Sequence, residues 1–384
     1  MRFIKADKIF SGKHFLEENN ILVLDDENRF VEFVPAAEIE NSQVEIHDGI
    51  LCPGFVNTHC HLELSHLFNK INTSLGLPGF AFEVVRRRNS FAEEEKALTM
   101  READLQMRKN GIVVVGDISN DIHSAEIKTK SPIHYHTFVE LIGLNPAHAT
   151  EIFSRGILLQ KEFISHHQPA SLSAHAPYSV SVPLMKLIFD FNDRNAQTSC
   201  IHHEESAEEE KFLSGKENLF TELYHKLKLD LSWYKSPDKR SAGLYENISP
   251  HHPLILVHNT FTRAEDLQRL CDKNIFYCFC PNANLFIENT LPDFNLFKNS
   301  CERICLGTDS LASNSELNIL SEANKIMERS RTFSIENILQ AITLNGAAAL
   351  GLSDSFGTFI KGKNAGLNLI SIENNRITLQ KKLA

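Results

Sequence analysis

Several features of membrane, secreted and nucleic-acid-binding proteins are missing from this 384-residue sequence. No apolar run approaches the roughly 18 residues of a membrane span, and the amino-terminal stretch lacks the apolar core of a signal peptide. The formal net charge of −10 argues against a polyanionic partner, and the one dense basic run, residues 86–88, resembles a solvated helix face more than a phosphate site. We therefore expect neither a membrane nor a nucleic acid as partner.

The cysteine pattern is also informative by what it lacks. None of the eight cysteines forms a Cys-x-x-Cys pair, which is typical of free thiols in a reducing cytoplasm. We interpret the cysteines between residues 278 and 305 as small buried side chains rather than a second metal site. The absence of Pro-Cys-x-x-Cys excludes the zinc deaminases of the His-x-Glu class, and the absence of His-Glu-x-x-His excludes zincin peptidases.

What the sequence does contain, from about residue 52, is an alternation of apolar runs and helix-like segments. Eight such runs predict eight parallel strands in an α/β fold, a (β/α)8 TIM barrel spanning residues 55–351. The predicted strands are Phe55–Thr58, Ile112–Ile118, Ile133–Leu141, Ala170–Ala174, Gln197–Ile201, Leu254–Val257, Ile275–Phe279 and Arg303–Leu306.

Both ends of the chain instead show the pattern of short strands separated by turns. Because residues 1–54 and 352–384 share this pattern, we predict that they form one small β-sandwich domain. Residues 228–252, after the fifth predicted strand, are long and irregular, which is compatible with either a functional loop or a surface insertion.

The segment "PGFVNTHCHLELSH" places two histidines one residue apart after a short apolar run. On a strand, His59 and His61 point to the same face and can converge on one atom, whereas on a helix they would diverge by about 200°. Convergent neutral imidazoles are typical of metal sites. The alternative is a strand with exposed histidines. If the strand continues, Glu63 shares the face of His61.

Other polar residues follow the later strands, where a barrel of this type carries its reacting groups. Taken singly, each has a structural explanation: a core histidine, the polar start of an acidic helix, a strand end that reaches solvent, or a capping aspartate. Their repeated occurrence at strand ends favours a joint site. The segments are "SAHAPYS" with His175, "IHHEES" with His202 and Glu205, "LVHNT" with His258, and "LGTDS" with Asp309.

Together with "CPNANL" after the seventh strand, these segments resemble the motifs of the amidohydrolase superfamily, in its mononuclear metal-dependent deaminase and chlorohydrolase branch. The resemblance covers nearly the whole chain. It implies that Glu205 moves a proton, that His258 positions the attacking hydroxide, that His175 contacts substrate, and that Asp309 accepts a proton from water. The implied metal ligands are His59, His61, His202 and Asp309.

The resemblance also implies the number of metal ions. The binuclear branch of the superfamily needs a carbamylated lysine at the end of the fourth strand, and "SLSAHAPYS" has no lysine, so we expect one divalent metal ion. A nitrogen-rich ligand set suits zinc first and iron second. Hydroxide formed at such a metal would attack an amino-bearing ring carbon, and loss of ammonia would complete a hydrolytic deamination at a carbon–nitrogen bond.

The substrate is less well defined. The segments "HLELS", "TFVELIGL" and "HHEESAEEEKFL" resemble those of aminodeoxyfutalosine deaminases of menaquinone biosynthesis. Candidate substrate contacts are Glu63, Glu140 and Trp233, although Glu63 could instead anchor its loop and Trp233 could simply pack. The helix after strand one lacks the tryptophan usual in S-adenosylhomocysteine and methylthioadenosine deaminases, and Phe82 is a candidate replacement.

Alternatives remain open. They are deamination of S-adenosylhomocysteine, adenosine, guanine, cytosine or a pterin, triazine dechlorination, and a metal-free scaffold barrel. The expected partner is a small-molecule substrate, and a homodimer is left open.

Overall fold

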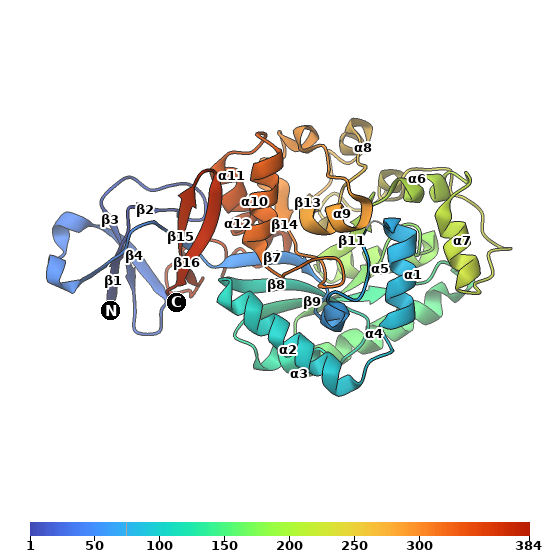
Figure 1. Cartoon of the computed structure of the whole chain (residues 1–384), viewed down its shortest axis with the longest axis horizontal. Helices are drawn as coiled ribbons and strands as arrows, with labels where there is room; N and C mark the ends of the chain where they lie inside the picture. Colours follow the sequence, from blue (N-terminus) through green and yellow to red (C-terminus); the bar gives the residue numbers. More distant parts are fainter. Residues whose placement is uncertain (74) are drawn as a thin grey trace.

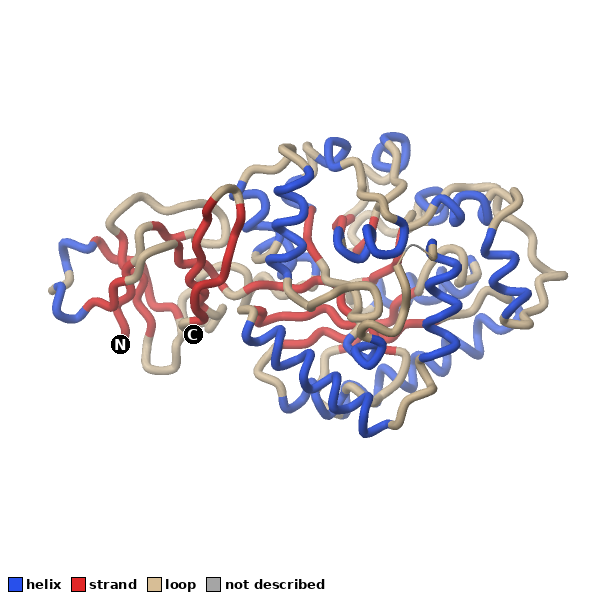
Figure 2. The backbone as a smooth tube through the Cα atoms, viewed as in Figure 1, coloured by secondary structure: helices blue, strands red, loops and turns tan. Residues whose placement is uncertain are grey.

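The computed structural model describes residues 1–73 and 75–384. Two parts are visible in Figure 1: a small region of strands that contains both chain termini, and a larger region in which helices surround parallel strands. Figure 2 shows the same division, with helices confined mostly to the outside of the larger part. No helix among the described residues is both long enough and apolar enough to cross a bilayer.

Eight parallel strands form the centre of the larger part, in two sheets of four. Every predicted run overlaps one of them, because buried parallel strands are apolar along their whole length. The first sheet has the order β10-β9-β8-β7 and the second the order β11-β12-β13-β14. The strands are β7 (Phe55–Cys60), β8 (Ile112–Ser119), β9 (His134–Leu141), β10 (Ala170–Ala174), β11 (Ser199–His203), β12 (Leu254–His258), β13 (Ile275–Phe279) and β14 (Ile304–Leu306).

Backbone hydrogen bonds connect the two sheets at both pairs of edges. The amide of His202 in β11 donates to the carbonyl of His175, just after β10, at 2.9 Å. On the other side, Asp309 after β14 forms a parallel bridge with Cys60 of β7, and its amide donates to the carbonyl of His59 at 3.1 Å. Gly307 makes this approach possible, because a Cβ there would lie 2.7 Å from the Cβ of His59.

The helices begin and end at recognisable signals. For example, the Ser181 side chain caps α5 with Pro183 in its first turn, and α2 stops before Gly111, whose φ is +79°. The helices are α1 (Gly76–Arg87), α2 (Glu93–Lys109), α3 (Ala125–Lys130), α4 (Ala149–Ser165), α5 (Val182–Arg194), α6 (Ala207–Leu213), α7 (Leu219–Lys226), α8 (Ala264–Arg269), α9 (Pro281–Glu288), α10 (Ile319–Arg329), α11 (Ile335–Ala341) and α12 (Leu344–Ala349).

Short 3-10 helices complete the chain. They are η1 (Ala36–Glu38), η2 (Asn41–Gln43), η3 (Leu62–Leu67), η4 (Pro146–His148), η5 (Ser241–Leu244), η6 (Phe294–Phe297) and η7 (Cys301–Arg303). Two of them matter for the site: η3 follows β7 directly, and η5 lies within the irregular segment before β12.

The small part also holds two sheets of four, in the orders β4-β3-β1-β5 and β16-β15-β6-β2. Antiparallel pairing of β6 with β15 brings segments from the two ends of the chain together. Ile4 and Leu22 from the first sheet pack in one cluster with Leu51 and Leu369 from the second. The strands are β1 (Arg2–Lys5), β2 (Lys8–Ile9), β3 (Asn20–Leu24), β4 (Phe30–Pro35), β5 (Val44–Ile46), β6 (Ile50–Pro53), β15 (Leu367–Glu373) and β16 (Arg376–Lys382).

Candidate metal centre and active site

The two histidines of "THCH" converge at the carboxyl end of β7. Their Nε2 atoms lie 3.1 Å apart, although only His59 is inside the strand. The strand does not continue to Glu63: β7 ends at Cys60 and the chain turns into η3 at Leu62. The amide of Leu62 donates to Asp117 on the neighbouring β8 at 2.7 Å, which holds the turn that follows His61.

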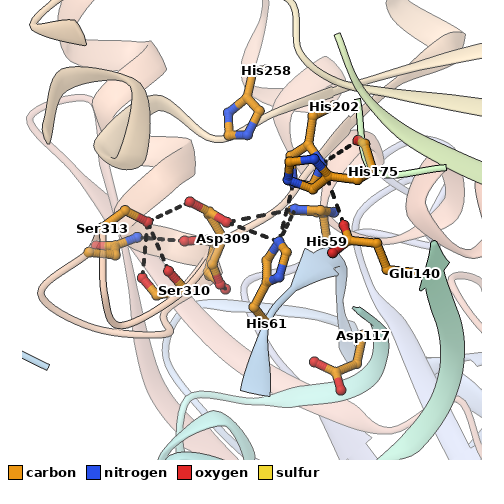
Figure 3. A network of polar contacts seen from close by, with 12 residues as sticks. His59, His61, Asp117, Glu140, His175, His202, His258, Asp309, Ser310 and Ser313 are labelled. Atoms are coloured by element: carbon orange, nitrogen blue, oxygen red, sulfur yellow. Dashed lines mark hydrogen bonds and ion pairs between the residues drawn. The ribbon is translucent and has the colours of Figure 1, made fainter. Parts of the chain in front are cut away.

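Four potential ligand atoms meet at this point, and Figure 3 shows the side chains pointing toward one another. The Nε2 of His61 lies 3.2 Å from that of His202 and 3.4 Å from Oδ1 of Asp309, which is itself 3.7 Å from Nε2 of His59. Two ligand atoms about 2.1 Å from a tetrahedral zinc ion would be about 3.4 Å apart. The donor set and its spacing therefore fit one small divalent cation.

A fifth donor lies close by. The side chains of His59, His202, His258 and Asp309 each offer an atom within 4.8 Å of the others. His61 nevertheless makes the shorter contacts, at 3.1 to 3.4 Å, and so completes the tighter set.

Burial controls the charges of this cluster. It lowers the pKa of His61 and of His202 well below the ordinary value, and the neighbouring imidazoles lower both further. For Asp309 burial alone would raise the pKa, but its contacts with His59, His61 and His258 outweigh that effect and lower it. Neutral imidazoles and an ionised carboxylate are the protonation states in which these groups bind a metal.

Neighbouring groups orient the ligands. The Nδ1–H of His202 donates to the carbonyl of His175 at 2.7 Å, which leaves Nε2 with its lone pair free. The hydroxyl of Ser313 donates a short hydrogen bond to Oδ2 of Asp309. Asp309 has a φ of +56° and His258 a φ of +77°, conformations that non-glycine residues rarely adopt. Such strain at two predicted site residues is typical of functional positions.

Glu205 and His258 face each other beside the metal ligands, with 3.5 Å between a carboxylate oxygen and Nε2. The Nδ1–H of His258 donates to Asn284 at 2.7 Å, and burial lowers the pKa of His258 to about 4, so its Nε2 carries a lone pair. Burial raises the pKa of Glu205 well above its ordinary value, and the charges of Asp309 and Glu288 raise it further. A raised pKa is the direction that a carboxylic acid needs in order to act as a proton donor.

The cluster occupies one end of a cavity that has a largely apolar wall. His61, His202, Glu205, His258 and Asp309 line its polar end. One face of α1 supplies much of the wall. The wall residues are Leu64, Leu77, Phe80, Ala81, Val84, Val85, Ile142, Tyr178 and Ile287.

The predicted substrate contacts divide into two groups. His175 and Glu140 line the cavity, whereas Glu63 lies behind it, with its carboxylate bound to Arg88 at 3.0 Å and to the amide of Asn120 at 2.8 Å. This geometry matches the alternative reading of Glu63 as a loop anchor. Trp233 lines a separate cavity with Leu144, Pro146 and Pro183. On α1 it is Phe80, not Phe82, that faces the site.

Some site residues were not singled out from the sequence. Arg88 and Asn120 line the cavity and bind each other at 3.0 Å. The basic run does contain a solvated pair, since Arg86 and Arg87 both bind Glu83, but the third arginine departs from that interpretation. Side chains of neighbouring residues on a helix point about 100° apart, so three consecutive arginines do not share one face. The sequence of the run therefore already indicated that its arginines would have different surroundings.

Comparisons with known proteins agree with this geometry. The model of the amidohydrolase family matches residues 50–382. The chain is 26% identical over 343 residues to an adenosine deaminase of Helicobacter pylori, a match that covers 88% of this chain and 82% of that protein. It is 24% identical over 388 residues to an aminodeoxyfutalosine deaminase of a Nitratiruptor species, covering 97% of this chain and 92% of that protein.

A solved structure shares the fold as well. The aminofutalosine deaminase of Helicobacter pylori in complex with methylthio-coformycin superposes with a TM-score of 0.85 at 23% identity, covering 97% of this chain and 93% of that one. The family match spans most of the sequence and includes all four candidate metal ligands. The chain belongs to the amidohydrolase family.

Proposed function

We propose that this protein is a metal-dependent hydrolytic deaminase that replaces the amino group of a purine-type ring with oxygen and releases ammonia. One observation carries the proposal: a three-histidine, one-aspartate donor set lies directly beside Glu205 and His258, at the polar end of a cavity with a largely apolar wall. Two relatives of this chain are named adenosine deaminase and aminodeoxyfutalosine deaminase, which supports a purine-type ring as the substrate.

The fold we propose for the larger part is a closed (β/α)8 barrel over residues 55–351. Hydrogen bonds at both sheet edges and the order of the eight strands support it. For residues 1–54 and 352–384 we propose one β-sandwich domain, supported by the apolar cluster that the two terminal sheets share.

His59, His61, His202 and Asp309 would hold one divalent ion, zinc in the first place and iron in the second, because imidazole and carboxylate donors suit both. Such an ion would lower the pKa of a bound water from 15.7 to about 7 and so supply hydroxide near neutral pH. We choose His61 over His258 as a ligand because its contacts with the other donors are shorter.

The protein's own groups would then handle the protons. Asp309 accepts the proton that the attacking water gives up. Glu205 delivers its proton to the ring nitrogen next to the amino-bearing carbon, so that the ring accepts the electron pair as the C–O bond forms. His258, whose Nε2 lone pair points into the site, holds the attacking water in line. Asp309 then passes the proton it accepted to the amino nitrogen, and the C–N bond breaks as ammonia leaves. The hydroxyl proton of the intermediate returns to Glu205 as the ring C=O forms.

Glu140 and His175 are the substrate contacts we propose. One carboxylate oxygen of Glu140 accepts a hydrogen bond from Asn120 at 2.9 Å, while its Oε1 is buried with no hydrogen-bond partner among the described residues. An unpaired buried acceptor suits an N–H or O–H donor of the ligand. We propose no direct contact for Glu63 or Trp233, because neither lines the cavity.

For the physiological substrate we propose 6-amino-6-deoxyfutalosine, in menaquinone biosynthesis, with adenosine-type nucleosides as the alternative. Two observations support this choice, the similarity to the Nitratiruptor deaminase over almost the whole chain and the apolar outer wall of the cavity. A cytoplasmic location is also part of the proposal, supported by the free state of all eight cysteines.

The test combines metal analysis with an ammonia assay. Purified protein should contain about one equivalent of zinc or iron. It should release ammonia from aminodeoxyfutalosine or another adenine nucleoside in a panel that also includes guanine, cytosine and an s-triazine. Protein that stays metal-free after zinc and iron loading, and that releases no ammonia from any compound, would instead support a scaffold barrel.

A further inference from the structure

We propose that Arg240 is a positioning residue for the deamination: it clamps Glu204 and thereby sets the direction of the neighbouring Glu205. This inference rests on the proposed function, because Glu205 is the proton donor there. Arg240 belongs to the irregular segment between α7 and β12, for which the sequence left open a functional loop or a surface insertion.

Arg240 uses its whole guanidinium group to bind residues from several elements. Nη2 contacts Glu204 at 2.8 Å and Asp266 at 2.7 Å, and Nη1 contacts Glu210 at 2.7 Å. Nη2 also donates to the carbonyl of Phe261 at 3.0 Å. The side chain is only 22% exposed. A planar group with five donors can serve several acceptors at fixed angles, and a lysine cannot reproduce that arrangement.

The backbone amide, the backbone carbonyl and the side-chain carboxylate of Glu204 all form hydrogen bonds. Its amide donates to the carboxylate of Glu209 at 3.1 Å, and its carbonyl accepts from the amide of Phe261 at 2.8 Å. Ser241, next to Arg240, donates to the same Glu209 oxygen. Glu204 has a φ of +46°, a left-handed conformation that persists only where the surroundings enforce it.

The contacts of Arg240 join two turns, and each turn adjoins one residue of the site, Glu205 in one case and His258 in the other. Glu204 precedes Glu205 at the end of β11, and Phe261 lies three residues after His258 at the end of β12. The amide of Asn259 adds a further bond to the carbonyl of His203 at 3.0 Å. Arg240 therefore ties together the turns that place Glu205 within 3.5 Å of His258. Loosening them would move the proton donor without removing a metal ligand.

The principal variant for the test is Arg240→Met, which keeps the length of the side chain and removes its hydrogen bonds and charge. We expect kcat to fall by about 100-fold, because misplacement of a reacting group by about 1 Å has an effect of that size. KM and bound metal should stay near wild type, since neither the ligands nor the cavity wall changes. Arg240→Lys should recover little of the loss, and guanidinium ions added to Arg240→Ala should recover part of it.

Arg263→Met is the matched control. Arg263 contacts the same Glu210 at 2.6 Å but is 56% exposed and lies outside hydrogen-bonding contact with Glu204. Its kcat should remain within about threefold of wild type, well below the tenfold that corresponds to about 1.4 kcal/mol. A kcat for Arg240→Met as close to wild type as that of the control would overturn the proposal. A loss that tracks metal content or thermal unfolding would overturn it equally.

A structural measurement separates this inference from the proposed function. In crystals of Arg240→Met, the Glu205 carboxylate should have moved away from His258 Nε2, and Glu204 should have left its left-handed conformation. If the wild type releases no ammonia from any compound of the panel, the proposed function fails, and the crystal structure still decides the positioning role. An unchanged Glu205 in the variant would contradict it. If Arg240→Met does not fold, Arg240→Lys serves for both measurements.

Discussion

Buried histidines occur at both ends of the parallel strands, but in different arrangements. At the amino ends the imidazoles contact separate hydroxyl groups: the buried His252 contacts that of Ser199 and the half-buried His136 that of Ser171, both at 2.9 Å. At the carboxyl ends the imidazoles face one another, with Nε2 of His61 3.1 and 3.2 Å from those of His59 and His202. Burial is common to His252 and to the three converging histidines. Convergence of lone pairs on one point is what distinguishes a candidate metal site from structural histidines.

The largest effect should come from removing a converging histidine. His61→Ala should lose most of the bound metal, to about a tenth of wild type or less, because three remaining ligands leave an open and weakly held site. Activity should fall with the metal. His252→Gln is the comparison at the opposite strand ends and should keep its full metal content, measured by elemental analysis. Equal metal retention by both variants would remove the distinction between the two ends.

Glu205→Gln should have the next largest effect. The amide keeps the size and the hydrogen-bonding capacity of the carboxyl group but cannot pass on a proton, so kcat should fall by about 10² to 10⁴. Bound metal should stay near one equivalent. Glu217→Gln, at an exposed position near α6, is the control and should match wild type. Metal loss in Glu205→Gln would reassign this residue as a ligand.

The ammonium group of Lys128, on α3, is paired with several partners and should matter mainly for stability. Lys128 is completely buried and binds Asp117 at 2.7 Å, together with the hydroxyls of Ser119 and Thr137. Lys128→Met would leave Asp117 as an unpaired buried charge, at a cost of about 3–5 kcal/mol in unfolding free energy. Asp117 also holds the amide of Leu62, so metal affinity should weaken too.

The exposed pair Lys130–Glu126 is the control for that measurement. Lys130→Met should change the unfolding free energy by less than about 1 kcal/mol, because solvent screens the pair. Urea unfolding of both variants tests the difference. A loss in Lys128→Met no greater than in Lys130→Met would show that the buried pair contributes nothing net.

The smallest effect concerns pH and a histidine at the amino ends. Burial lowers the pKa of His252 to about 4, against 6.5 in the unfolded chain. Above pH 6.5 this histidine is neutral in both states and the unfolding free energy is at its full value. As the pH falls from 6.5 toward 4, the unfolded chain binds a proton that the folded protein does not, so the unfolding free energy decreases. Between pH 7.5 and 5.5 this residue should account for about 1.4 kcal/mol of lost stability. Between pH 7.5 and 5.5 the unfolding free energy of His252→Gln should therefore fall by about 1.4 kcal/mol less than that of the wild type, measured by chemical unfolding. The same pH dependence in both proteins would contradict the assignment.

The sequence allowed much of this arrangement to be predicted. All eight parallel strands could be located, because strands buried on both faces appear as short apolar runs between helix-like segments. The motif residues at their carboxyl ends led to the amidohydrolase family, which the family match confirms. His59, His61, His202 and Asp309 do meet at one point, since parallel strands place their carboxyl ends at the same edge.

Other residues could not be placed from local patterns. Glu63 would share the face of His61 on a continuing strand, but the chain turns into η3, and Glu63 binds Arg88 instead. Trp233 lies in an irregular segment whose path no periodicity predicts, and it lines a different cavity. The role proposed for Arg240 depends on carboxylates that precede and follow it in the sequence by up to 36 residues.

The sequence by itself determined the residue types and the order of the strands, because hydrophobic periodicity and chemical identity are local properties of a chain. The tertiary structure alone decided which of the polar residues converge, which charges are paired, and which side chains line the cavity. These depend on distances between residues far apart in the sequence, such as the 3.4 Å between His61 and Asp309. Packing of the strands sets those distances, and with them the burial that shifts the pKa of each group in the site.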